Sequence, residues 1–111
     1  DTEYAPRALF MIADGEFRMK HFDIARDKFD GFIKIFSKHA WIDKARQRAA
    51  ESAFRFCVSA FEAHQYDKAR ECFENFKTGY PADSRVKEVD NYLAKIKEMP
   101  VGQPQAGKAD S

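Results

Sequence analysis

The longest regular pattern of apolar and polar positions lies in the middle of the chain, over residues 41–64. This segment contains neither Gly nor Pro, and two series of apolar residues recur in it at spacings of three and four. The first series is Ile42, Ala45, Ala49, Ala53, Phe56, Ala60 and Ala63, and the second is Ala50, Phe54, Cys57 and Phe61. Such spacing predicts an α-helix, and a helix that is apolar on two faces lies between two layers. We therefore expect a long central helix shared by a helical unit before it and another after it.

Four shorter segments carry the same spacing, so the sequence predicts an all-α fold of five helices. They cover about residues 1–19, 23–36, 67–79 and 84–97. The expected helix-starting residues are Thr2, Asp23, Asp67 and either Asp83 or Ser84, whose side chains suit an N-cap. The expected buried face of the first helix is Leu9, Ile12, Ala13 and Phe17 and, one turn earlier, Tyr4 and Ala5. The last helix has one apolar stripe and is otherwise charged, which is typical of a terminal capping helix.

Residues 99–111 differ from the rest of the chain. They contain Pro and Gly and show no apolar periodicity, so they cannot bury enough surface to offset the entropy of ordering. The sequence therefore predicts one repeat domain over residues 1–98, followed by a flexible tail over 99–111.

The chain also repeats itself with an offset of 44 residues. Aligned at this offset, Ala5, Phe10, Phe17, Asp23, Ala25, Arg26, Phe29 and Phe32 match Ala49, Phe54, Phe61, Asp67, Ala69, Arg70, Phe73 and Phe76. The identities fall on apolar positions and on the aspartate near a helix start, where a repeated helical hairpin is most constrained. The repeat predicts two antiparallel helix pairs and a capping helix, stacked as a short right-handed solenoid.

Two segments of the repeat resemble a known family. Residues 22–29 (FDIARDKF) and 66–73 (YDKARECF) are similar to the aromatic–Asp–x–Ala core of tetratricopeptide repeats, and Tyr80-Pro81 resembles the repeat ends of bacterial envelope proteins of the outer-membrane assembly lipoprotein and Tol-Pal coordinator types. The period of 44 is longer than the roughly 34 residues of that family. The resemblance implies a protein-binding module in the bacterial periplasm or at its membranes, and a cytoplasmic location stays open.

The resemblance also implies where a partner would bind. In tetratricopeptide repeats the first helix of each pair lines a concave groove. The matching positions here are Arg7, Phe10, Asp14, Arg18, Glu51, Phe54, Val58 and Glu62, together with Phe17 and Phe61. Aromatic and arginine side chains are frequent anchors of protein interfaces. The alternative is that these phenylalanines belong to the core, and it is favoured for Phe17 and Phe61 and left open for Phe10 and Phe54.

A second candidate surface is the basic start of the central helix. Its residues are Trp41, Lys44, Arg46 and Arg48, to which an acidic partner could bind. The plainer interpretation is that the charges are solvated and that Trp41 packs against the preceding hairpin. The Lys and Asn residues that hold a peptide carboxylate in chaperone-binding members of the family are missing at the matching positions, so a chaperone adaptor is not expected.

Composition and motifs argue against other classes of protein. With 19 basic and 18 acidic residues, the net charge of +1 gives no reason to expect nucleic acid or an anionic membrane as partner. No phosphate loop, catalytic triad or metal-ligand spacing occurs, so we expect no enzyme, cofactor or metal. Direct insertion into a membrane is not expected either, and the sequence sets no oligomeric state.

The sequence favours packing rather than chemistry as the role of the two cysteines. Cys57 falls in a small-residue position of the repeat, so we expect a core thiol, and a disulfide with Cys72 is possible on antiparallel helices but less favoured. The expected function is a non-catalytic protein-binding module that scaffolds an envelope assembly. The alternative is a structural subunit or domain of a larger complex with no groove ligand.

Overall fold

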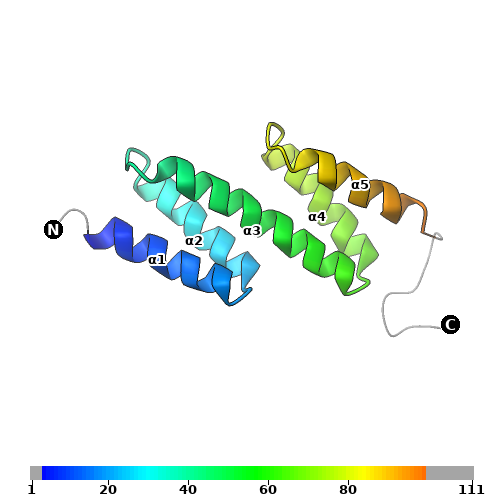
Figure 1. The fold of residues 1–111 in the computed structure, drawn as a ribbon, viewed down its shortest axis with the longest axis horizontal. Coiled ribbons are helices and arrows are strands. Elements are labelled where there is room, and N and C mark those ends of the chain that lie inside the picture. The colour runs from blue at the N-terminus through cyan, green and yellow to red at the C-terminus, as the bar shows by residue number, and fades with distance from the viewer. Residues whose placement is uncertain (1–3, 100–111) are drawn as a thin grey trace. The chain divides into compact units, whose positions relative to one another are not determined.

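A computed structural model describes residues 4–99, which form five α-helices and, within that range, no strand (Figure 1). The helices are α1 (Tyr4–Arg18), α2 (Phe22–Ile35), α3 (Ile42–Glu62), α4 (Tyr66–Gly79) and α5 (Val86–Lys97). The all-helical class and the number of helices are thus as predicted. The expected cap Thr2 and the expected tail, apart from Met99, lie outside the described residues.

The helix starts differ from the sequence prediction. α2 begins at Phe22 with His21 as its N-cap, and α4 begins at Tyr66 with Gln65 as its N-cap, so Asp23 and Asp67 lie inside the first turn. α5 begins at Val86, and the Asp83 carboxylate instead accepts a hydrogen bond from the backbone N–H of Arg85 at 2.8 Å. An acidic residue in the first turn still stabilises a helix through its dipole. The acidic side chains therefore mark the helix starts without capping them.

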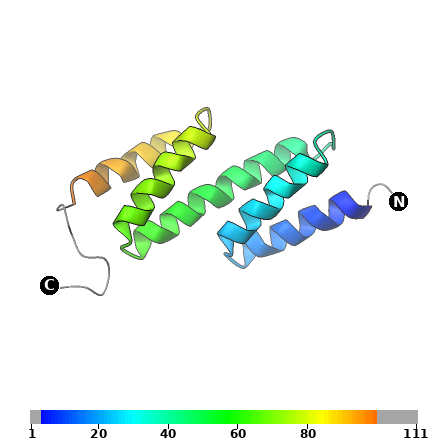
Figure 2. The same ribbon diagram turned by 180° about the vertical axis from the view of Figure 1, so that it is seen from behind.

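The chain divides into two compact units, residues 1–53 and 54–111, and the division falls within α3. In unit 1, α1 and α2 lie side by side and antiparallel (Figures 1 and 2). The core of this unit contains Phe10, Ala13, Ala25, Phe29, Phe32, Ala45 and Ala49, with Trp41 and Phe17 packed against it. Tyr4, Ala5 and Ile12, which we expected to be buried, are exposed (Tyr4 74% and Ile12 53%), because the buried face of α1 is centred on Phe10 and Ala13.

Unit 2 has its own aromatic core. Phe73 is fully buried, and its ring stacks on that of Tyr92 of α5 with centroids 4.8 Å apart. Phe54 contacts Phe73, Phe76 and Tyr92 at centroid distances of 6.0–6.2 Å. Aromatic pairs at these distances contribute about 0.5–1.5 kcal/mol beyond the burial of their area.

The 44-residue repeat is visible in the backbone. Lys20 (φ 66°) and His64 (φ 63°) are the described non-glycine residues with positive φ, and they occupy the same repeat position. The N–H of His21 donates to the carbonyl of Glu16, and that of Lys20 to Phe17, as in a Schellman motif. The same two bonds recur from Gln65 to Ala60 and from His64 to Phe61, all four at 2.9 Å. Both hairpins therefore turn in the same way, which confirms the repeat as a repeat of local structure.

These turns give a first prediction. A non-glycine residue in the left-handed region destabilises the folded state by about 1–2 kcal/mol. Gly adopts this region without strain, but its greater freedom in the unfolded chain costs about 0.4–1 kcal/mol. We expect His64→Gly and Lys20→Gly each to raise the free energy of unfolding by roughly 0.5 kcal/mol in urea denaturation. The exposed Gln65→Gly variant is the control and should destabilise, since Gln65 has negative φ.

Candidate functional site

Two sets of residues that the sequence placed on separate surfaces meet in unit 1. The Arg7 guanidinium of α1 lies over the Trp41 ring, with its carbon 5.3 Å from the ring centroid. The Lys44 ammonium of α3 lies 5.3 Å from the same ring and 5.8 Å from the Phe10 ring. The Phe10 and Trp41 rings are themselves 5.1 Å apart and edge to face. We call Arg7, Phe10, Trp41 and Lys44 the Trp41 cluster.

Trp41 packs against the core of unit 1 and contacts a histidine. The backbone N–H of Trp41 donates to Nδ1 of His39 at 2.9 Å, and the two rings are 5.5 Å apart. The same turn recurs before α5, where Asp83 takes the place of His39. Trp41 is half-buried, whereas Arg7 and Lys44 are exposed. The cluster therefore places two exposed cations over one half-buried aromatic ring.

A second group of charges lies along the same two helices. Asp14 of α1 forms ion pairs with Arg18 at 2.9 Å and with Arg48 of α3. The Asp14 side chain is 16% exposed and that of Arg48 37%, so this pair is partly shielded from water. The Arg48 guanidinium also lies over the Phe17 ring at 5.9 Å. Arg46, by contrast, points elsewhere and pairs with Asp43 on the exposed side of α3.

Burial changes the role of the expected groove phenylalanines. Phe10 is 5% exposed and belongs to the core of unit 1, so a partner cannot use its ring as an exposed anchor. Phe54 is half-buried and contacts three aromatic rings of unit 2. Phe17 and Phe61 are half-buried as well, with Phe17 packed against the core and Phe61 5.0 Å from Tyr92.

The remaining expected groove residues lie in different places. Glu51 is a half-buried residue of unit 1, and in unit 2 Val58 is half-buried and Glu62 exposed. At the 44-residue offset, Val58 corresponds to Asp14 and Tyr92 to Arg48. An ion pair in one unit is therefore replaced by two largely apolar residues in the other.

The Asp14–Arg48 pair gives a second prediction. Removing one partner leaves the other partly buried and unpaired, and we expect Asp14→Ala to lower the free energy of unfolding by about 1–2 kcal/mol. The exposed pair provides the control, since Asp43→Ala should cost no more than about 0.5 kcal/mol. The double variant Asp14→Val/Arg48→Tyr, which copies unit 2, should recover part of the loss in urea denaturation. An equal effect of Asp14→Ala and Asp43→Ala would contradict this assignment.

Tyr92 gives a third prediction, on pH dependence. Burial, followed by the negative charges of Glu88 and Glu62, raises the pKa of the Tyr92 hydroxyl above its ordinary value of 10.0. The unfolded chain therefore loses the Tyr92 proton at a lower pH than the folded chain does. As a result, the free energy of unfolding should fall as the pH rises above about 10. Thermal melts from about pH 9 to about pH 11 should show a steeper loss for the wild type than for Tyr92→Phe, with the exposed Tyr4→Phe as control.

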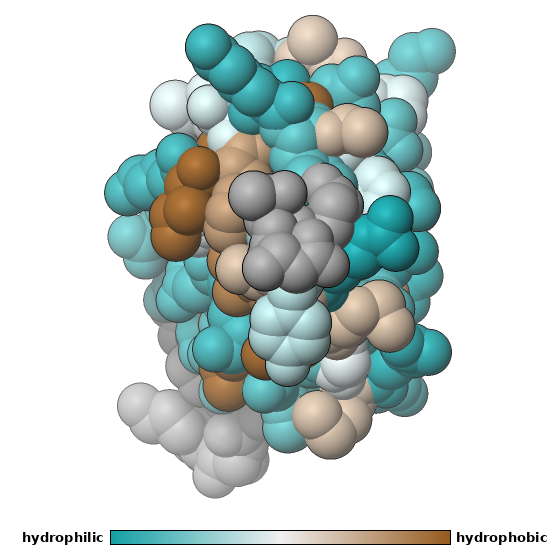
Figure 3. All heavy atoms as spheres, turned by 90° about the vertical axis from the view of Figure 1, so that its left-hand side faces the viewer, coloured by the Kyte–Doolittle hydropathy of each residue, from teal (hydrophilic) through white to brown (hydrophobic). Residues whose placement is uncertain are grey.

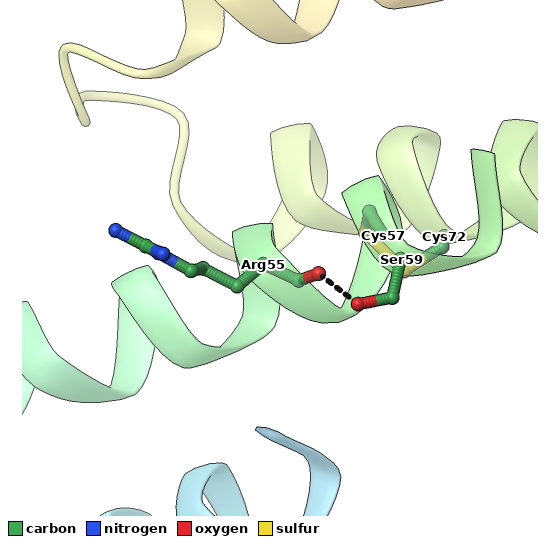
Figure 4. Close-up of a disulfide and its surroundings, with 4 residues drawn as sticks. All are labelled: Arg55, Cys57, Ser59 and Cys72. Carbon is green, nitrogen blue, oxygen red and sulfur yellow. Dashed lines mark hydrogen bonds between the residues drawn. A yellow bond between two sulfur atoms is a disulfide. The ribbon is translucent and has the colours of Figure 1, made fainter. Parts of the chain in front are cut away.

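The two cysteines form a disulfide, which corrects the expectation of free thiols. Cys57 of α3 and Cys72 of α4 are joined, with their Cα atoms 5.3 Å apart (Figure 4). Cys57 is fully buried, and the neighbouring Ser59 hydroxyl donates to the Arg55 carbonyl of the same helix at 3.0 Å. A disulfide sulfur is neither a nucleophile nor a thiolate ligand, so its role here is to join α3 to α4.

The histidines and carboxylates of the described residues do not gather into a metal site. Within residues 4–99, no group of three or more His, Cys, Asp or Glu side chains is placed to hold a metal ion. His21 pairs with Glu16 at 2.8 Å, and His64 forms the turn before α4. In the same part of the chain, no helix has both the length and the apolar character needed to cross a bilayer.

Comparison with known proteins adds no family to this description. No protein-family model, curated protein or solved structure matches the sequence. The case for a function therefore rests on the geometry of unit 1 and on the repeat.

Proposed function

We propose that this protein is a non-catalytic, tetratricopeptide-like helical repeat module that binds an acidic segment of a protein partner. The observation that carries the proposal is the Trp41 cluster, in which Arg7 and Lys44 each lie 5.3 Å from one tryptophan ring. Trp and Arg are the residues most enriched among interface residues that contribute strongly to binding. We therefore place the binding surface on α1 and α3 in unit 1 rather than along the whole groove that the repeat predicts.

The chemistry of the Trp41 cluster favours a carboxylate-rich partner. Both cations already lie over the Trp41 ring, and this contact limits the side-chain entropy that they lose when a carboxylate binds. The Trp41 ring, half-buried, offers an apolar face beside them. A segment that combines acidic residues with an apolar side chain would match both features.

The repeat and the disulfide support the proposed architecture and setting. Two hairpins with the same turn geometry suit a short right-handed solenoid with α5 as its cap. Structural disulfides persist in oxidising compartments such as the bacterial periplasm. Together with the family resemblance, the Cys57–Cys72 bond favours a periplasmic scaffold of an envelope assembly.

The test combines a pull-down with charge reversal. The full chain and its Arg7→Glu/Lys44→Glu variant are immobilised and exposed to envelope extract, after circular dichroism has shown equal helicity. Lys34→Glu/Lys97→Glu, which reverses two exposed charges on α2 and α5, is the matched control. We expect a partner that the wild type and the control retain, that the cluster variant loses, and that elutes with salt.

Binding is then measured with the identified acidic segment as a synthetic peptide. Trp41 is the single tryptophan of the chain, so its fluorescence reports on the cluster directly. A titration that shifts its emission supports the proposal. Equal capture by all three proteins would instead favour the alternative of a structural subunit that does not use this surface.

A further inference from the structure

The turn that leads into α3 has a close counterpart before α5, at the 44-residue offset. The same two backbone hydrogen bonds form in both turns at 2.9–3.1 Å, from His39 to Phe36 and Ile42 to His39 in one, and from Asp83 to Tyr80 and Val86 to Asp83 in the other. A side chain completes each turn. Nδ1 of His39 accepts from the backbone N–H of Trp41 at 2.9 Å, and the Asp83 carboxylate accepts from that of Arg85 at 2.8 Å. His39 therefore supplies the acceptor for which the second turn uses a carboxylate.

The bond from Trp41 requires a neutral His39. A backbone N–H can only donate, so Nδ1 of His39 accepts through its lone pair and the ring proton lies on Nε2. A second proton would occupy Nδ1 and remove the acceptor. Histidine is the side chain that ordinarily changes charge between about pH 5 and about pH 8, whereas an aspartate carboxylate ordinarily remains an acceptor over that range. The turn before α3 is therefore sensitive to pH where its counterpart is not.

The charges around His39 also oppose a further positive charge. The Trp41 ring, 5.5 Å from the His39 ring, carries Arg7 of α1 and Lys44 of α3. From α2, the Phe32 ring approaches the His39 ring to 5.5 Å. The charged residues of the adjoining chain are exposed, namely Lys34, Lys38, Asp43 and Arg46, the last two being paired. A proton on His39 would add a third cation at the Trp41 ring, beside the positive end of the α3 dipole.

The turn is open to water. It lies at the end of Figure 1 where α1 begins, and Figure 3, which faces that end, shows mostly hydrophilic side chains in teal. Within the turn, Ser37, Lys38 and Ala40 are exposed and His39 is half-buried. His39 can therefore exchange a proton with solvent while the core of unit 1 stays closed.

We propose that His39 is a pH-sensitive switch, whose protonation opens the turn before α3 and loosens Trp41 from α1. Nδ1–H and the Trp41 N–H would face each other as two donors, so the His39 ring moves away and the Trp41 N–H loses its partner. The Trp41 cluster is then formed in neutral solution and weakened in acid. The binding surface proposed above would change with it, and only this consequence rests on the proposed function.

Hydrogen exchange of the backbone amides, measured by NMR on the full chain without a partner, tests the proposal. Rates at about pH 7.5 and about pH 5.5 are converted to protection factors, which remove the ordinary effect of pH on exchange. We expect the protection of the Trp41 N–H to fall by about two- to tenfold in acid, the range that one hydrogen bond represents. The Arg85 N–H, bonded to Asp83, is the internal control and should keep its protection.

Substitutions at position 39 distinguish the loss of this bond from general effects of acid. His39→Asn keeps an acceptor that does not titrate, so the Trp41 N–H should be equally protected at both pH values. His39→Ala lacks the acceptor and should show the low protection at both. His21→Gln removes the exposed histidine of the same unit and should respond to pH as the wild type does. The emission wavelength of Trp41 should follow the same order, because an open turn exposes the ring.

Three results would overturn the proposal. A wild-type response to pH in His39→Asn would show that another group is responsible. Full protection of the Trp41 N–H in His39→Ala at about pH 7.5 would show that Nδ1 does not hold the turn. An equal loss of protection at Phe29, in the core of unit 1, would mean that acid unfolds the whole unit. Since the measurements need no partner, the proposed function keeps its own separate test.

Discussion

Removal of the disulfide is expected to lower the free energy of unfolding by about 3 kcal/mol, which is the loop-closure value for a loop of this length. The Cys57–Cys72 bond closes a loop with a sequence separation of 15. Its main effect is to restrict the unfolded chain, so the variant Cys57→Ala/Cys72→Ala should keep its helicity in water but unfold at lower urea. The expected fall in melting temperature is roughly 10–20 °C.

Reduction of the wild-type disulfide distinguishes the effect of losing the bond from the effect of replacing the two side chains. With a phosphine reductant the wild type should unfold near the midpoint of the double variant, and the double variant should not respond to reductant. A thiol assay on the oxidised, denatured wild type should detect no thiol, because both cysteines are in the disulfide. A wild type whose midpoint is unchanged by full reduction would show that the bond adds no stability.

The helices were predictable because their signal is local. Spacings of three and four identified every helix of residues 4–99, and Phe29, Phe32, Phe73 and Phe76 lie buried as the stripes require. The starts of α2, α4 and α5 were missed by one or two residues because N-cap preferences pointed to Asp23 and its equivalents. The hairpin turns are so short that His21 and Gln65 already cap the next helix.

The disulfide was missed although the sequence contains a signal for it. Cys57 and Cys72 are equally distant from the turn at residues 64–65, so two antiparallel helices bring them level with each other. The small-residue position of Cys57 in the repeat favoured a packing role, so the disulfide was the less favoured of the two possibilities. The pairing of Asp14 with Arg48 had no comparable signal, because it depends on which faces of α1 and α3 meet.

The exposed face of α1 shows a limit of periodicity. A helix that is apolar on two sides gives the same spacing on both, and the pattern does not say which side another element covers. Ile12 and Ala13 are neighbours in sequence, yet one is 53% and the other 0% exposed. The contacts of α1 with α2 decide between them, and they leave Ile12 outside the core.

The second large effect is expected from the two repeat-equivalent core residues Phe29 and Phe73. Both are 0% exposed, and truncation of a buried Phe to Ala costs about 3–5 kcal/mol through lost burial and the cavity that remains. Since small proteins are stable by only about 5–15 kcal/mol, either Phe29→Ala or Phe73→Ala should remove a large part of the total. The Leu variants, which keep most of the apolar volume, should lose less.

Because Phe29 and Phe73 lie in different units, the two substitutions also test whether the units unfold together. Trp41 fluorescence reports on unit 1, whereas far-ultraviolet circular dichroism reports on all helices. If the units form one cooperative structure, both probes will give the same lowered urea midpoint for each variant. If they unfold separately, Phe73→Ala will lower the midpoint seen by circular dichroism and leave that of Trp41 near the wild-type value. A loss below about 1 kcal/mol for both variants, the average for any substitution, would contradict the core positions assigned to these rings.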